Sequence, residues 1–478
     1  MHNPQAASWS ELLSGRNGLR SLALAGGVAL HAINVYIVTT ILPSVVKDIG
    51  GLEYYAWNTT LFVVASILGS ALSPKGMDAF GPRHAFLLAI AVFAVGTTIC
   101  AATPSMGWML FGRTGQGLGG GLLLGLSYSL TRVVFEERLW SRAMALISSM
   151  WGIATLSGPA IGGIFAQTGH WRLAFWVVLP IAAFLAWLVV TQIAAKPAAT
   201  AGAALKAPLG KISLLVISVL VVSVASLSDQ IIWNVVGIAI GFGMSIGLAR
   251  LDRQAQVKLM PTGAYSLKTP LGNLYACVAL LSLGVTVEIF VPYFLQEIHG
   301  YTPLMAGYLT ALMAGGWTLG SLISSSRQPV VANRLVRCGP VVSSLSLASL
   351  AVLMPLAPLS HSYIGDWWLI LPLLGVGFGI GISWPHMLTR VFKASPSGQE
   401  NIASSATITI QLYAMAMGAA IAGMVANAAG FTNPGGTPGA QQAALALFAV
   451  FTVAPALAAF LIGGVVRPHK ADTVAESA

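Results

Sequence analysis

The sequence predicts an all-α, polytopic membrane protein with 14 transmembrane helices, arranged as two six-helix bundles plus a two-helix insert. Two features of the composition predict this class. Only 8% of the 478 residues are Asp, Glu, Lys or Arg, against about 25% in ordinary globular proteins. The hydrophobic share is 56% and the mean hydropathy is +0.80, so we expect most of the chain to face lipid.

Apolar runs of about 17–25 residues, the length that spans a bilayer, recur along the whole chain. In order they are 21–45, 57–74, 84–102, 106–131, 143–166, 172–194, 212–228, 231–249, 272–296, 304–326, 340–357, 367–390, 402–428 and 441–466. Only Asp229 and Gln230 separate the seventh run from the eighth. Because residues 212–249 are too long for one crossing, we expect a return hairpin there.

The positive charges indicate the orientation. Of the 24 Lys and Arg residues, 21 fall on alternate connections between the runs, including Lys196, Lys206, Arg467 and Lys470. The other connections carry only Lys47 and Arg172, and Arg113 lies within a run. Since cytoplasmic loops are rich in Lys and Arg, both termini are expected in the cytoplasm and the protein in the plasma (inner) membrane.

The composition excludes several other classes of protein. The net charge of +10 comes from scattered residues rather than a basic run, so we expect no nucleic-acid partner. Cys100, Cys277 and Cys338 have no metal-ligand or disulfide spacing. No phosphate-binding loop or catalytic triad is found, so we expect no enzyme, no cofactor and no metal. The run that begins at residue 21 lacks a small-residue cleavage pattern, which predicts a retained first span. We expect the protein to be a monomer.

A weak internal repeat predicts the domain organisation. Gly117, Gly119 and Gly121 recur as Gly375, Gly377 and Gly379, at an offset of 258 residues. The segment 158–163 matches 418–423 in its glycines, and the runs 21–45 and 272–296 both contain a late proline. Duplicated halves are common in transporters. We therefore expect bundles at 1–195 and 272–478, the second ending in a short cytoplasmic tail, with an insert and linker at 196–271.

Three motifs lie in the first half. The connection after residue 74 contains Asp78, Gly81 and Arg83, which predicts a tight cytoplasmic turn with a carboxylate near a helix N-terminus. The run 106–131 contains Arg113 and Gln116 among its glycines. The run 143–166 contains Gly158, Pro159, Gly162 and Gly163, which permit close helix approach and a bend, or serve packing alone.

Together these motifs resemble the major facilitator superfamily, and with 14 predicted spans the chain is similar to its drug:proton antiporter group. The turn resembles the superfamily's loop signature, here a gating loop. The Arg113 stretch resembles its fourth-span motif, and Gly158 to Gly163 resembles its fifth-span exporter motif. The first-span Asp common in the family falls on Asn34 here. An amide cannot gain or lose the proton that this Asp carries in the family. The resemblance therefore does not identify which residue of this chain carries the proton.

Ionisable groups within the spans are candidates for the chemistry, because burying them in lipid is costly. Glu288 is the one carboxylate well inside a predicted span, where desolvation favours its protonated form. We predict a coupling or substrate role for it, with a hydrogen-bonded structural carboxyl as the alternative. Arg113 needs a partner such as Gln116, Asn34 or a carbonyl, and its role is either coupling or structural.

Two further polar residues face the expected cavity. His31 precedes Asn34 by three residues on the same helical face, so it either titrates in place of the missing Asp or is a satisfied hydrogen-bonding group. Gln411 is either a cavity amide, with Asn34 and Gln116, or a hydrogen bond between helices.

The sequence therefore predicts a secondary active transporter that exports amphipathic drugs or related small compounds by alternating access. Protons, the substrate and membrane lipid are its expected partners. Two alternatives remain open at this point. The chain could be a facilitator or importer of one metabolite on the same fold, or a membrane sensor or binding protein that does not transport.

Overall fold

The computed structural model describes residues 8–195, 208–228, 230–325, 327–356 and 367–466, and the regular structure in these ranges is entirely helical. The elements are α1 (Trp9–Leu13), α2 (Gly15–Ile49), η1 (Leu52–Tyr54), α3 (Trp57–Ala101), α4 (Met106–Val134), α5 (Glu137–Gln167), α6 (Leu173–Trp176), α7 (Val178–Gln192), α8 (Leu209–Ala225), α9 (Ile231–Gln254), α10 (Pro270–Gly284), η2 (Val285–Ile289), α11 (Val291–Glu297), α12 (Pro303–Ser324), α13 (Pro329–Leu353), η3 (Trp367–Leu369), α14 (Ile370–Ala394), α15 (Glu400–Ala428) and α16 (Gly436–Val466). Lys196, Lys206, Asp229, Arg467, Lys470 and the expected cytoplasmic tail lie outside the described residues.

The prediction of 14 transmembrane helices is wrong. Within the described residues, ten helical segments are long and apolar enough to cross a membrane. The predicted runs 57–74 and 84–102, apart from residue 102, lie in one such segment, Leu52–Ala101, and α8 has only 17 residues. α4 and α12 are not among the ten, because they carry glycines and polar residues where they pack against neighbouring helices.

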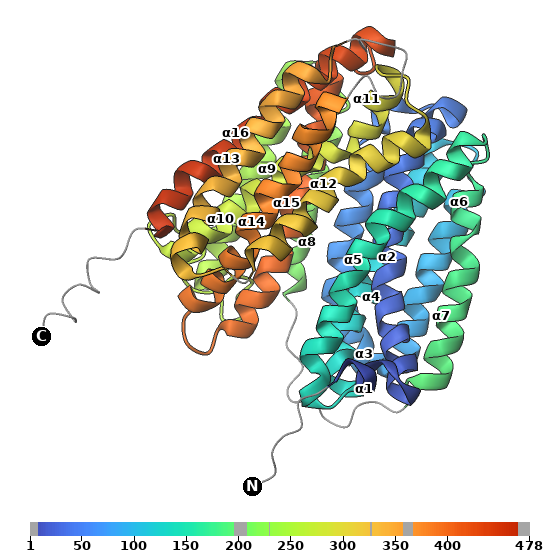
Figure 1. The fold of residues 1–478 in the computed structure, drawn as a ribbon, viewed down its shortest axis with the longest axis vertical. Helices are drawn as coiled ribbons and strands as arrows, with labels where there is room; N and C mark the ends of the chain where they lie inside the picture. The colour runs from blue at the N-terminus through green and yellow to red at the C-terminus, as the bar shows by residue number, and fades with distance from the viewer. Residues whose placement is uncertain (1–7, 196–207, 229, 326, 357–366, 467–478) are drawn as a thin grey trace, which may run out of the picture.

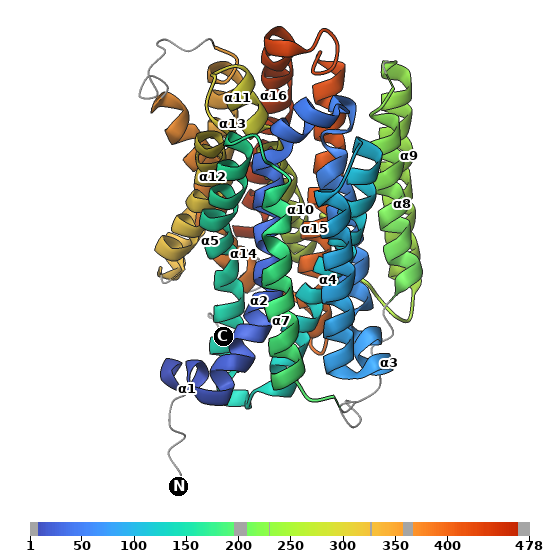
Figure 2. The same cartoon turned by 90° about the vertical axis from the view of Figure 1, so that its right-hand side faces the viewer.

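The helices form two groups (Figure 1). α1 to α7 lie together on one side, α10 to α16 lie together on the other, and α8 and α9 pair with each other at the edge of the molecule (Figure 2). We call the first two groups the first and second halves. Their ribbons converge at the end where α6 and α11 lie and separate toward the end where α1 lies (Figure 1). The boundaries at 195/196 and 271/272 stay a prediction.

Glycines set the packing inside each half. A Cβ at Gly117 would lie 2.2 Å from the carbonyl oxygen of Phe62, and one at Gly119 would lie 2.4 Å from the backbone nitrogen of Phe93. Because α3 breaks at Gly81 into two arms, 57–80 and 82–101, α4 is packed between these two arms. In the second half, Gly377 and Gly379 of α14 make the same kind of backbone contact with α12 and α13. Only Gly fits at such close approaches.

These contacts correct the register of the internal repeat. Gly117 contacts the first arm of α3, and its counterpart by contact is Gly377, which approaches Met313 of α12. Gly119 likewise corresponds to Gly379. The offset is therefore 260 residues rather than 258, the same offset that relates Gly158 to Gly418. The glycines recur every second residue, so the sequence pattern matches almost equally well when it is shifted by two.

The α8–α9 hairpin is attached to the second half through a partly buried polar contact. The Tyr413 hydroxyl of α15 lies 3.1 Å from Ser218 Oγ of α8 and 2.5 Å from Ser245 Oγ of α9. Side chains of α3, including Phe62 and Val64, pack in the same apolar cluster as α8 and α15. The hairpin therefore contacts both halves but is hydrogen bonded to the second through α15.

Candidate functional site

The centre of the first half is a buried guanidinium. Arg113 of α4 is 2% exposed, and its Nη1 donates to Asn34 Oδ1 of α2 at 2.5 Å and to Gln116 Oε1 at 2.8 Å. Its Nε donates to the carbonyl oxygen of Asn58 at 3.1 Å, and its Cζ lies 4.1 Å from the centroid of the Phe62 ring. All three kinds of predicted partner are present, together with a cation–π contact that the sequence did not reveal.

Gln116 extends this network to the second arm of α3. Its Nε2 donates to Thr97 Oγ1 at 3.0 Å, and Cys100 Sγ donates to its Oε1 at 3.6 Å. No carboxylate forms an ion pair with Arg113 among the described residues. Neutral acceptors therefore surround the positive charge, which remains uncompensated within this half.

Two amide atoms beside Arg113 have no hydrogen-bond partner in the described part of the chain. They are Asn34 Nδ2 and Asn58 Oδ1, and both side chains are fully buried. Such atoms carry a free-energy cost of about 1–3 kcal/mol each. Asn58 was missed by sequence reasoning, although a polar residue inside a predicted apolar run was a usable signal.

His31 lies beside this network rather than in it. Its ring stacks on Phe62 at 5.1 Å between centroids and meets Trp151 of α5 edge-on at 5.8 Å. His31 Nδ1 is buried without a partner among the described residues, and a Cβ at Gly120 would lie 2.6 Å from it. Phe62 therefore contacts both His31 and Arg113. Whether His31 titrates stays a prediction.

Glu288 lies where the two halves meet, apart from the Arg113 network. It is half-buried in η2 of the second half, and α11, which follows η2 directly, packs against α2 of the first half, where Tyr36 lies. Tyr36 is also adjacent to Gly158, where an added Cβ would lie 2.4 Å from Tyr36 Cβ. The carboxyl group is thus placed at a contact between halves, and its coupling role stays a prediction.

The Gly158–Gly163 segment of α5 packs on both halves. Gly158 and Gly162 face α2, with Gly162 close to the backbone of Ile37. A Cβ at Gly163 would lie 2.5 Å from Leu304 Cα of α12, and one at Gly307 of α12 would lie 3.1 Å from Pro159 Cβ. The motif therefore allows close backbone contact across the interface between halves.

The predicted turn is a sharp break inside α3. Gly81 has φ +75° and ψ +165°, a conformation open essentially to Gly, so it ends one arm and starts the next. Arg83 Nε donates to the carbonyl oxygen of Ile193 at 2.7 Å, just beyond the end of α7. Asp78 is exposed, and its predicted contact with a helix N-terminus is not seen among the described residues. We call this end of the molecule the Gly81 end.

The opposite end, the Asp48 end, is fastened by polar contacts. Arg172 Nη1 and Trp171 Nε1 donate to Asp48 Oδ2 at 2.5 Å and 3.2 Å, which ties the start of α6 to the end of α2. Lys47 and Glu297 lie 3.9 Å apart and join α2 to α11, so this ion pair crosses between the halves. Gln411 is not brought into either cluster and lies half-buried on α15.

A buried carboxylate outside the predicted sites organises the connection from α9 to α10. Asp252 is 0% exposed and accepts from Lys211 Nζ at 2.5 Å, from the Leu259 and Met260 backbone nitrogens at 2.8 and 3.1 Å, and from the Tyr265 hydroxyl at 3.0 Å. Burial and the Asp252 carboxylate raise the pKa of Tyr265, so its hydroxyl stays a donor. Sequence reasoning missed this cluster, because most donors to Asp252 are backbone nitrogens and a hydroxyl, which no charge pattern marks, and Lys211 lies 41 residues away.

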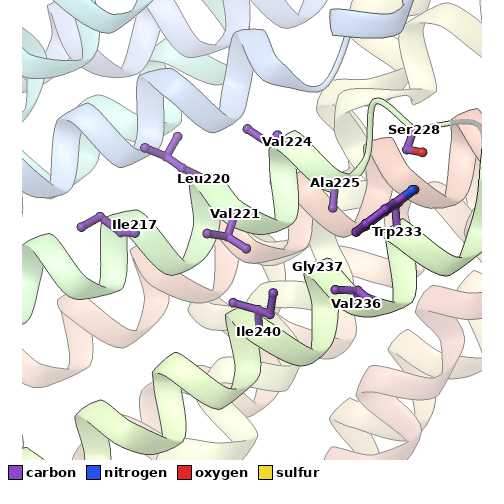
Figure 3. Close-up of a pocket in the computed structure, with 10 residues that line it drawn as sticks. All are labelled: Ile217, Leu220, Val221, Val224, Ala225, Ser228, Trp233, Val236, Gly237 and Ile240. Carbon is purple, nitrogen blue, oxygen red and sulfur yellow. The ribbon is translucent and has the colours of Figure 1, made fainter.

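A groove of about 610 Å³ lies between α8 and α9 (Figure 3). Its walls are aliphatic except for Ser228 and Trp233, and none of the predicted site residues lines it. It is therefore separate from the Arg113 network and from Glu288.

Two helical halves pack on each other through glycine-lined helices, an arginine is buried in one half, and a carboxyl group lies where the halves meet. This arrangement is that of a membrane transporter. The chain belongs to the Major Facilitator Superfamily, whose family model matches residues 24–423. The resemblance seen in the motifs is thereby confirmed at the level of the superfamily, and the fourteen-span subgroup is not.

Relatives cover nearly the whole chain. The probable multidrug-efflux transporter Rv1634 of Mycobacterium tuberculosis is 35% identical over 463 residues, 95% of this chain and 96% of that protein. Multidrug resistance protein 3 of Bacillus subtilis is 23% identical over 84% of this chain and 78% of its own.

Solved structures share the fold. A POT family transporter in complex with 5-aminolevulinic acid matches with a TM-score of 0.67 at 15% identity, covering 97% of this chain and 99% of that one. A bacterial homolog of the human lysosomal transporter Spinster, inward-facing and unoccupied, matches with a TM-score of 0.63 at 15% identity, covering 95% and 99%. By its family and its 35% identical relative, the chain is a multi-pass transporter of small molecules.

Proposed function

We propose that this transporter is a drug:proton antiporter that exports amphipathic, aromatic or cationic compounds by alternating access. The observation that carries the proposal is the half-buried Glu288 in η2, beside the contact of α11 with α2 of the opposite half. A carboxyl group there changes the charge at the interface when it gains or loses a proton. The names of the full-length relatives support drugs as substrates.

The proposal also gives the orientation of the protein in the membrane and the roles of the remaining site residues. The Gly81 end and both termini face the cytoplasm, the Asp48 end faces outward, and the plasma membrane holds the protein as a monomer. Arg113, Asn34, Gln116, His31 and Gln411 belong to the substrate and coupling region. The segment 196–271 links the bundles 1–195 and 272–478, whose relative motion opens each side in turn.

The energetics limit the gradient that such an exporter can build. One proton crossing a potential of about 150 mV releases about 3.5 kcal/mol. That drives a gradient of a few hundredfold for a neutral substrate. A monovalent cation exchanged for one proton gains nothing from the potential, so the dependence of efflux on membrane potential separates the two stoichiometries.

The test is a drug-susceptibility panel on cells that lack other exporters, with three forms of the protein. We expect the wild type and Glu53→Gln to raise tolerance and Glu288→Gln to abolish the gain. Glu53 is the matched control, because it is an exposed carboxyl group at the Asp48 end. Tolerance that survives in Glu288→Gln rejects the coupling role, and the absence of any response to the wild type rejects efflux.

Vesicle transport distinguishes export from the alternatives. In inverted vesicles, an imposed proton gradient should drive substrate accumulation by the wild type. Uptake in right-side-out vesicles without proton counter-flow indicates a facilitator or importer. Binding without transport in either orientation indicates a sensor.

A further inference from the structure

Tyr55 of the first half is inserted into the second half at the Asp48 end. It lies between η1 and α3 and is 1% exposed. Its ring centroid lies 5.1 Å from that of Phe290, 5.6 Å from that of Tyr293 and 5.6 Å from that of Phe431. All three partners belong to the second half, so the Tyr55 side chain crosses the interface.

The three partners form a preassembled aromatic socket. Phe431 lies 5.2 Å from Phe290 and 4.7 Å from Tyr293, again between ring centroids. These contacts lie within the second half and do not depend on Tyr55. The arrangement is a knob in a hole, and burying such a ring together with its aromatic contacts stabilises this closed arrangement.

The hydroxyl of Tyr55 opposes that stabilisation. It is buried, and no hydrogen-bond partner for it exists in the described residues. A phenol oxygen removed from water without a partner destabilises the state in which it is buried. Withdrawal of the ring from the socket would return the hydroxyl to water and remove this penalty.

We propose that Tyr55 is the plug of a gate at the Asp48 end, and that its unpaired hydroxyl makes the gate easier to open. The other contacts across this interface include the Lys47–Glu297 ion pair at 3.9 Å and the bond from Asn427 Nδ2 to the Glu53 carbonyl oxygen at 3.4 Å. Both are long and partly exposed, so they contribute little. The backbone packing of α5 on α12 also holds this end closed. The plug acts together with that packing, and its unpaired hydroxyl shifts the balance toward the open state.

The proposal rests on the alternating access of the proposed function, and its test measures opening directly, without substrate or a proton gradient. A cysteine at Thr40 reports opening. Thr40 of α2 is 2% exposed and faces Gly307 of the second half, and cysteine is close to threonine in size. The background carries Cys338→Ser, because Cys338 is exposed while Cys100 and Cys277 are buried.

The rate at which a membrane-impermeant maleimide added to intact cells labels Thr40→Cys measures the open population. Tyr55→Phe keeps the ring and removes the hydroxyl, so we expect labelling about tenfold slower, which corresponds to about 1.4 kcal/mol. Tyr55→Ala removes the plug and should label faster than the parent. Tyr54→Phe is the matched control and should label at the parent rate, since Tyr54 is half-buried and outside the socket.

Labelling of Tyr55→Phe at the parent rate or faster overturns the role of the hydroxyl. Phe431→Leu weakens the socket from the other half and should speed labelling; an unchanged rate in both Phe431→Leu and Tyr55→Ala overturns the plug. Inverted vesicles show from which side the reagent enters. A protein that opens as expected but exports no drug leaves the gate intact and rejects only the proposed function.

Discussion

Arg113 has two amide partners, and the structure predicts that losing them has unequal consequences. Gln116 Oε1 and Asn34 Oδ1 both accept from Arg113 Nη1, at 2.8 and 2.5 Å. By distance alone, Asn34 is the more important. We expect the opposite order when each amide is replaced by leucine.

The reason is the second atom of each amide. Gln116→Leu removes a hydrogen bond to a charged group, at a cost of about 1.5–3 kcal/mol. Thr97, which loses the Gln116 donor, still donates to the Phe93 carbonyl oxygen at 2.8 Å. Asn34→Leu removes a similar bond but also removes the unpaired Nδ2, whose burial costs about 1–3 kcal/mol. The net cost of Asn34→Leu is therefore about zero.

The assay is thermal unfolding of the purified variants in one detergent. At about 2 °C per kcal/mol, we expect Tm to fall by about 4 °C for Gln116→Leu and to stay within about 2 °C of the wild type for Asn34→Leu. Gln411→Leu is the control for the exchange itself, because Gln411 shows no hydrogen bond among the described residues and should not move Tm. A fall in Asn34→Leu as large as in Gln116→Leu refutes this reasoning.

Four other variants test the packing, the break in α3 and the connection from α9 to α10. Gly117→Ala drives a methyl group into backbone and should cost about 1–3 kcal/mol, whereas Gly152→Ala meets nothing within 4 Å and should raise Tm slightly; equal Tm values would contradict the packing of α4 between the arms of α3. Gly81→Ala places a side chain at a positive φ, which should destabilise the folded state by about 1–3 kcal/mol and lower Tm accordingly. Asp252→Ala leaves Lys211 without its carboxylate, at a cost of about 3–5 kcal/mol, and should speed tryptic cleavage after Arg253; an unchanged digestion pattern would exclude a structural role.

Composition and motif spacing were sufficient for the all-helical membrane class, the superfamily, and the neighbours of Arg113. They failed where the signal depends on what covers a helix. α4 lies between the arms of α3, so glycines and polar groups replace apolar surface along it. Counting apolar runs in the sequence therefore overestimates how many helices are long and apolar enough to cross a membrane. Tyr55 was missed because its partners lie far away in the chain. Asp252 was missed because most of its partners are backbone nitrogens and a hydroxyl, which no charge pattern marks.

The first-span Asp common in the family is Asn34 here, so the proposed function assigns the fixed positive charge and the titrating carboxyl group to two separate places, Arg113 and Glu288. Among the described residues, Arg113 has neutral acceptors only, whereas Glu288 lies where the halves meet. Under the proposed function, a proton therefore changes the charge at the interface and leaves the Arg113 network as it is. Asn34→Asp adds a carboxylate within reach of the guanidinium, which holds it as an ion pair.

Asn34→Asp should for that reason fail to restore drug tolerance to Glu288→Gln. The measurement is the susceptibility of cells carrying the double variant, with Asn34→Asp alone as the control for expression and folding. Tolerance regained in the double variant would show that a carboxyl group anywhere in the cavity can carry the proton. Coupling would then depend on the presence of a titrating group and not on its position between the halves.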